Sequence, residues 1–123
     1  MNNNDGMKLT DELDDPKVVQ IILNDRPFLC LGNSNEFHYS ILEAFLKSMD
    51  VTYKTVSIMG ETVPALRGEN YKVVGMGRLF VNIRNGQKMA TFGTNSYMYG
   101  IGINKKFVEA VKEHNPEWIV KIW

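Results

Sequence analysis

The sequence predicts a mixed α/β fold, a single-domain sandwich in which helices pack on the faces of a mixed sheet of about six strands. Three observations support this fold. Short β-branched and apolar runs recur along the chain, two segments carry apolar residues at the helical period, and Asn85-Gly86 separates two strand-like runs. The 123 residues suit one domain, which at this size buries about two-thirds of the surface exposed by its unfolded chain.

The amino-terminal part predicts a tail followed by two strands. Residues 1–15 contain five acidic residues and three asparagines, so we expect a disordered acidic tail before a domain that spans residues 16–123. Residues 17–23 and 28–31 are apolar enough for strands, and an Asn-Asp-Arg-Pro turn separates them. The only cysteine, Cys30, lies in the second run, which predicts packing and excludes an intramolecular disulfide.

A helix and a less regular segment come next. A polar loop at residues 32–35 precedes apolar residues at helical spacing, and the cap is expected between Ser34 and His38. The apolar residues of this helix are Phe37, Ile41, Leu42, Phe45, Leu46 and Met49. Residues 51–58 predict a strand, whereas residues 60–70, with Pro64 and Gly68, predict a loop or an excursion with one short element.

The carboxyl-terminal part predicts a hairpin, a helix and a last strand. Asn85-Gly86 favours a type I′ turn between strands at 77–84 and 87–92, because both central residues of that turn need a positive φ. After a loop bounded by glycines at residues 93–102, Asn104 is expected to cap a helix that ends before Pro116. Residues 118–123 alternate as a strand does, and we expect them to complete the sheet.

Composition excludes several classes of function. Fourteen basic residues balance fourteen acidic ones, so no overall field favours nucleic acid or an anionic membrane. There is neither an apolar run of membrane-spanning length nor a signal-peptide core. With two separated histidines and no clustered carboxylates, we expect no metal and no cofactor. A cytoplasmic monomer is the expectation.

His38 is the candidate for chemistry. It lies where the polar loop becomes the first helix, and the amides of a helix's first turn attract anions because they lack acceptors. An imidazole with an unperturbed pKa of about 6.5 can act as a nucleophile or as a general base near neutral pH. A solvated or capping histidine is the alternative. His114, near the end of the second helix, is expected to interact with that helix's dipole.

Three motifs and one lysine resemble the small, metal-independent protein histidine phosphatases of the janus/ocnus family. Glu36-Phe37-His38 resembles the family's Glu-Tyr-His, Gly75-Met76-Gly77-Arg78 its Gly-Gly-Gly-Arg, and Ser96-Tyr97-Met98-Tyr99-Gly100 its Ser-Met-Ala-Tyr-Gly. Lys17 stands where the family has an active-site lysine. The chain departs from the family in a longer segment between His38 and Arg78, in Met76, and in an extra residue before Ser96.

The resemblance implies hydrolysis of phosphohistidine in proteins, and also of phospholysine and small phosphoramidates. His38 is then the catalytic base or the transient phosphoryl acceptor, and the amides of His38 and Tyr39 hold phosphoryl oxygens. Arg78 supplies a fork of donors and Lys17 a point charge at the edge of the site. The expected partners are proteins or peptides that contain phosphohistidine.

The resemblance also implies an opposing cradle, made by the Ser96 hydroxyl and the amides near Ser96 and Met98. Gly93 and Gly100 then permit the sharp loop. Tyr97 and Tyr99 are candidates to line the groove, while Phe37 is expected to pack in the core.

Less specific interpretations stay open. Arg78 and Lys17 are also explained as surface charges at strand ends, and Ser96 as a turn hydroxyl. A noncatalytic module that binds phosphate or phosphoprotein is the alternative function. A third hypothesis is a structural protein whose long middle segment contacts a partner.

Overall fold

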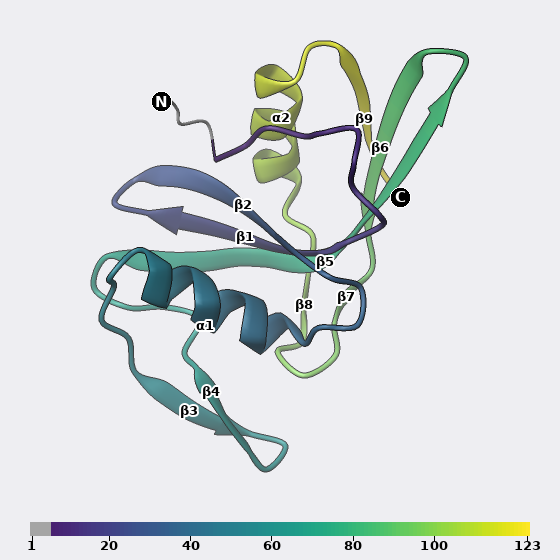
Figure 1. Ribbon diagram of the computed structural model, residues 1–123. Coiled ribbons are helices and arrows are strands. Elements are labelled where there is room, and N and C mark those ends of the chain that lie inside the picture. Colours follow the sequence, from purple (N-terminus) through teal and green to yellow (C-terminus); the bar gives the residue numbers. More distant parts are fainter. Residues whose placement is uncertain (1–5) are drawn as a thin grey trace.

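A computed structural model describes residues 6–123 as a mixed α/β fold around a five-stranded sheet of order β2-β1-β5-β6-β9 (Figure 1). The strands are β1 Lys17–Leu23, β2 Arg26–Gly32, β5 Tyr71–Arg84, β6 Gln87–Gly93 and β9 Trp118–Ile122. β6 and β9 pair in parallel, whereas the other neighbours are antiparallel. The sheet is therefore mixed, as the sequence predicts, with five strands rather than about six.

The two helices cover opposite faces of this sheet. Figure 1 shows α1, His38–Ser48, on one side of β1 and α2, Lys105–His114, on the other. Strand side chains alternate between faces, so the neighbours Val18 and Val19, both fully buried, belong to different apolar clusters. Val18 packs in the cluster that contains the α2 residues, and Val19 in the cluster that contains the α1 residues.

Two small hairpins lie outside the central sheet. β3, Thr55–Ile58, pairs with β4, Glu61–Pro64, and β7, Asn95–Ser96, pairs with β8, Ile101–Gly102. The predicted strand at 51–58 is thus shorter, and β4 is the one short element within 60–70. Three of the four residues of β3 are exposed, and this strand pairs with β4 and not with the central sheet.

Part of the segment that the sequence assigns to an acidic tail packs against the domain. Met7 and Leu9 are buried and belong to the α2-side cluster. Asn115, fully buried after α2, accepts a hydrogen bond from the Leu9 amide at 2.9 Å and donates to the Met7 carbonyl at 2.8 Å. These bonds hold Met7 and Leu9 against the end of α2, whereas residues 1–5 lie outside the described residues.

Several local predictions are confirmed. Asn85 and Gly86 have φ of 53° and 77° between the paired ends of β5 and β6, as a type I′ turn requires. Asn104 caps α2 by accepting from the Phe107 amide at 2.9 Å. Cys30 is buried, and burial raises the pKa of its thiol to about 12, which fits packing rather than nucleophilic attack.

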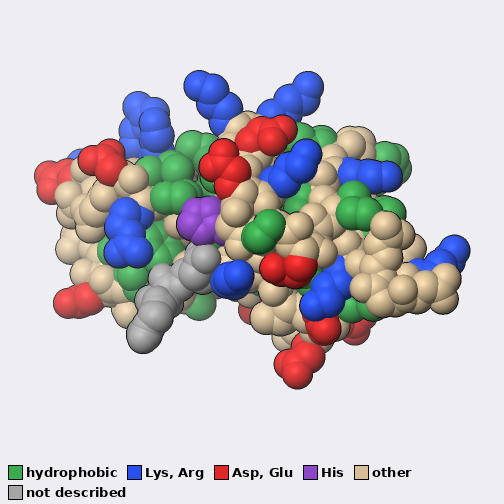
Figure 2. All heavy atoms as spheres, turned by 90° about the horizontal axis from the view of Figure 1, so that it is seen from above, with side chains coloured by type: hydrophobic (Ala, Val, Ile, Leu, Met, Phe, Trp, Pro, Cys, Tyr) green, Lys and Arg blue, Asp and Glu red, His purple; other side chains and the backbone are tan. Residues whose placement is uncertain are grey.

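Surface charge follows the balanced composition. On the face that Figure 2 shows from above, basic and acidic side chains are interspersed and no large area carries one sign. Any strong anion site on this face must therefore be local. Over residues 6–123, neither helix is long and apolar enough to cross a membrane.

Candidate functional site

A pocket of about 340 Å³ lies where the start of α1, the start of β1, the middle of β5 and the β7–β8 loop meet. Its lining includes all six residues that the sequence assigns to catalysis or phosphate binding, namely Lys17, His38, Tyr39, Arg78, Ser96 and Met98. His114 does not line it. The fold thus gathers residues that are up to 81 positions apart, from Lys17 to Met98.

Two cations on neighbouring strands line this site. Lys17 on β1 and Arg78 on β5 are direct cross-strand partners, an arrangement in which like charges destabilise a sheet. The salt bridges within residues 6–123 involve other cations, Lys47 and Lys88. The paired charges of Lys17 and Arg78 are therefore not neutralised by a carboxylate of the described chain.

The Arg78 guanidinium is positioned by the backbone of Asp15 and the ring of Phe80, and one of its donors has no acceptor among the described residues. Its terminal nitrogen donates to the Asp15 carbonyl at 3.2 Å, and its guanidinium lies 6.0 Å from the Phe80 ring centroid. The Asp15 carboxylate also accepts from the Val81 amide at 2.8 Å, which ties residue 15 to β5. The Nε atom of Arg78 is buried without a hydrogen-bond partner among the described residues. A buried donor of this kind is costly unless a ligand satisfies it.

His38 is oriented by the backbone of β5. Its Nε2 lies 2.9 Å from the Gly77 carbonyl oxygen, and because a carbonyl only accepts, Nε2 carries the proton and Nδ1 keeps a free lone pair. Burial lowers the pKa of His38, and the charges of Lys17 and Arg78 lower it further, while the bond to Gly77 acts in the opposite direction. The neutral imidazole, which is the form a nucleophile or base needs, is therefore favoured at neutral pH.

The start of α1 lacks a capping side chain. Its N-cap is Phe37, whose backbone is extended and whose side chain cannot accept a hydrogen bond. The Phe37 carbonyl accepts from the amides of Ser40 and Ile41 at 3.0 and 3.2 Å. The amides of His38 and Tyr39 come before these in the first turn and have no intrahelical acceptor. They are suited to an anion in the pocket.

Ser96, on β7, lines the same pocket as the start of α1. Its hydroxyl oxygen accepts from the Tyr99 amide at 3.2 Å and its carbonyl accepts from the Gly100 amide at 2.8 Å, while Gly100 has φ of 70°. The hydroxyl thus serves the turn, and it still has a proton to donate. Thr94, with φ of 62°, and not Gly93, takes the left-handed conformation at the start of this loop.

The glycines of β5 allow the strand to approach its neighbours closely. A Cβ atom on Gly75 would collide with the Gln20 side chain and would lie 2.8 Å from the Asn104 amide nitrogen. A Cβ atom on Gly77 would collide with the Gly93 carbonyl. Gly77 therefore fixes the strand whose carbonyl orients His38, whereas Met76 between them is buried in the α1-side cluster.

The predicted role of Phe37 is wrong. Its side chain is 59% exposed and lines the pocket because an extended N-cap residue falls outside the buried stripe of its helix. Its ring stacks on Tyr39 at 5.2 Å between centroids and lies 5.8 Å from the Lys17 ammonium. Tyr97 and Tyr99 line the pocket, as the sequence predicts.

Sequence reasoning did not assign two other lining residues, Met59 and Asn95. Met59 belongs to the turn of the β3–β4 hairpin, and Asn95 begins β7. The position of Asn95, next to the recognised Ser96 motif, is a signal that could have found it. Met59 carries no such signal, because its approach to the pocket depends on a hairpin within the least regular part of the sequence.

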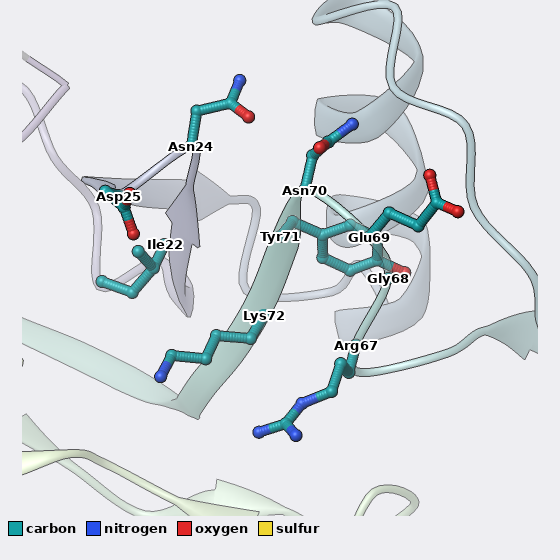
Figure 3. Close-up of a pocket in the computed structure, with 9 residues that line it drawn as sticks. All are labelled: Ile22, Asn24, Asp25, Arg67, Gly68, Glu69, Asn70, Tyr71 and Lys72. Carbon is teal, nitrogen blue, oxygen red and sulfur yellow. The ribbon is translucent and has the colours of Figure 1, made fainter.

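A second pocket, of about 390 Å³, offers no comparable chemistry. Figure 3 shows its lining, which comes from the end of β1, the β1–β2 turn, and the start of β5 with the segment before it. Asp25 and Glu69 offset Arg67 and Lys72, and the lining contains neither histidine nor cysteine. The pocket at His38 is therefore the candidate functional site.

Comparisons with known proteins do not identify a family. No family model matches the chain, and a search of curated proteins finds no match. Among the described residues, no group of three or more histidine, cysteine, aspartate or glutamate side chains is placed to hold a metal ion. The function is consequently inferred from the site itself and from the motifs in the sequence.

Proposed function

We propose that this protein is a phosphohistidine phosphatase that hydrolyses the P–N bond of phosphorylated side chains, with His38 as nucleophile or general base. One observation carries the proposal. An unneutralised cross-strand pair of cations, Lys17 and Arg78, lies beside a neutral histidine at an uncapped helix start. Such a site suits a phosphoryl group, whose transfer needs mainly positioning and charge stabilisation. The resemblance to the janus/ocnus phosphatases gives the same reaction and the same residues.

Binding of the phosphoryl group follows from the free donors. The amides of His38 and Tyr39 and the spare Nε donor of Arg78 supply hydrogen bonds to its oxygens, and the Lys17 ammonium supplies charge. The Ser96 hydroxyl and the amide of Met98 complete the opposite side in this proposal.

Two routes use the same free lone pair on His38 Nδ1. In the first, Nδ1 attacks phosphorus, the P–N bond breaks as the leaving nitrogen gains a proton, and water later hydrolyses the phosphorylated His38. In the second, Nδ1 removes a proton from water, whose oxygen attacks phosphorus as the P–N bond breaks and the leaving nitrogen gains a proton. Both routes release inorganic phosphate and the unmodified side chain.

The test is release of phosphate from a phosphohistidine peptide, measured with a chelator present. We expect turnover by the wild-type protein, and a loss of about 100-fold or more in His38→Ala, because a positioned base or nucleophile contributes about 10²–10⁴-fold. His114→Ala is the matched control, since His114 does not line the pocket. It should keep the wild-type rate.

Phosphate binding separates catalysis from recognition alone. Inorganic phosphate at a hundred times its Kd should stabilise a protein by about 2.7 kcal/mol, and His38→Ala should keep most of that stabilisation through Lys17 and Arg78. Wild-type protein that binds the phosphopeptide but never hydrolyses it would overturn the enzyme proposal in favour of a noncatalytic recognition module.

A further inference from the structure

We propose that the turn of the β3–β4 hairpin, together with Phe37 and Tyr97, binds an apolar side chain next to the phosphorylated residue of a polypeptide substrate. This apolar rim, defined as Met59, Phe37 and Tyr97, rests on the proposed function and gives it a substrate class. The substrates are then segments of protein chain in which an aliphatic or aromatic residue neighbours the phosphorylated one. Small phosphoramidates use only the interior of the pocket.

Exposure is the first support. Met59, Phe37 and Tyr97 are 62%, 59% and 85% exposed, and all three line the same pocket as His38. They come from three separate parts of the fold, the β3–β4 turn, the start of α1 and the β7–β8 loop. Single exposed apolar residues are common, whereas three that converge on one pocket form a patch of the kind that binds ligands.

The hairpin turn is the second support. Met59 and Gly60 have φ of 52° and 82° between the paired residues Ile58 and Glu61, which is the geometry of the Asn85-Gly86 turn at the end of the central hairpin. Asparagine tolerates the left-handed conformation, whereas most other residues, methionine included, adopt it unfavourably. The turn itself therefore does not explain a methionine at this position, whose side chain lines the pocket.

The hairpin is also fixed against the site. The Tyr99 hydroxyl, from the β7–β8 loop, donates to the Pro64 carbonyl at the end of β4 at 2.8 Å. The Ala65 amide donates to the Lys54 carbonyl at 2.8 Å, which closes the base of the hairpin. These bonds tie the base of the hairpin to the β7–β8 loop, and the turn that carries Met59 lines the same pocket as this loop.

The combination of cations and apolar side chains determines which kind of ligand fits the pocket. The interior offers the cations Lys17 and Arg78, and the rim offers apolar side chains. A ligand that satisfies both has an anionic group and an apolar group a short distance away. Free phosphate has no apolar group, whereas a phosphorylated polypeptide with an apolar neighbouring residue has both.

The test compares Met59→Asn with the wild type on two phosphohistidine peptides, one with leucine and one with serine beside the phosphorylated residue. Asparagine favours the turn, so the variant should fold while losing the apolar contact. We expect the wild type to prefer the leucine peptide by about tenfold in kcat/KM, and Met59→Asn to lose most of that preference. Turnover of a small phosphoramidate measures any effect of Met59→Asn that does not depend on the rim, and the loss for the leucine peptide should exceed that effect by about tenfold. Met49→Asn, an exposed methionine outside the pocket lining, is the control and should keep the preference.

The affinities of His38→Ala for both peptides, with and without Met59→Asn, measure the contribution of the rim to binding in the absence of turnover. A leucine preference that disappears with Met59→Asn supports the rim even where the wild type hydrolyses nothing, an outcome that would overturn only the proposed reaction. The proposed role of the rim would be overturned by an unchanged leucine preference in Met59→Asn. It would also be overturned by an equal loss of kcat/KM for both peptides and the small phosphoramidate.

Discussion

The two helices begin in opposite ways. At the start of α2, the Asn104 side chain accepts from the Phe107 amide, and the Asn104 amide donates to the buried Gln20 side chain at 2.7 Å. At the start of α1, Phe37 takes the capping position without a side-chain hydrogen bond, and the first turn opens into a pocket. The protein thus caps the first-turn amides of α2 with a side chain, whereas it leaves those of α1 without one.

The start of α1 gives up stabilising interactions that would also block the binding of an anion. A capping side chain is worth about 1 kcal/mol, and α1 does without it next to the two unneutralised cations Lys17 and Arg78. Both features are unfavourable for the empty protein and favourable for a bound anion. Together they support a phosphate site at α1 and give no reason to expect one at α2.

Removing the cap of α2 is the largest expected change in stability. Asn104→Ala should lower the free energy of unfolding by about 1–2 kcal/mol, because the Phe107 amide loses its acceptor. Chemical denaturation measures this loss, with the exposed Asn82→Ala as the control. The stabilisation by inorganic phosphate should stay at the wild-type value. A smaller phosphate effect in Asn104→Ala would show that the two helix starts are not independent.

Closing the open start of α1 should have a smaller and opposite effect. Phe37→Asn supplies a capping acceptor, whereas Phe37→Ala removes the same ring without supplying one. We expect the asparagine variant to be more stable than the alanine variant by about 0.5–1 kcal/mol. It should bind phosphate more weakly, because its side chain competes for the first-turn amides. Thermal unfolding with and without phosphate measures both quantities, and equal phosphate binding by the two variants would contradict an anion site at this turn.

Local signals explain what could be predicted from the sequence. Asn85-Gly86 and Asn104 act within a few residues of themselves, so the hairpin and the α2 cap need no knowledge of the rest of the fold. The grouping of the pocket-lining residues could be predicted because they belong to short motifs that resemble those of one family. The backbone register then brings them together, as the pairing of Lys17 with Arg78 shows.

Long-range packing explains what could not be predicted. Met7 and Leu9 stand in an acidic segment, and their burial depends on Asn115, more than 100 residues away. Met59-Gly60 lacks the usual asparagine or aspartate of a hairpin turn, so β4 and its approach to the pocket gave little signal. Phe37 keeps the helical spacing in sequence but leaves the helical stripe because its backbone is extended.

The smallest expected effect concerns the charge beside His38. Burial is the main cause of the lowered pKa of His38, with Lys17 and Arg78 as secondary causes, so Lys17→Met should raise that pKa only in part and leave it below 6.5. Because the pKa in the folded protein lies below that of the unfolded chain, His38 favours unfolding as pH falls from 6.5 toward its folded value. In Lys17→Met this window narrows, and the acid limb of kcat/KM moves to higher pH. Titration of the His38 ring by NMR measures the shift, with the exposed Lys72→Met as the control. An unchanged or lower pKa in Lys17→Met would show that the Lys17 charge does not act on His38, and the cations would then serve the phosphoryl group alone.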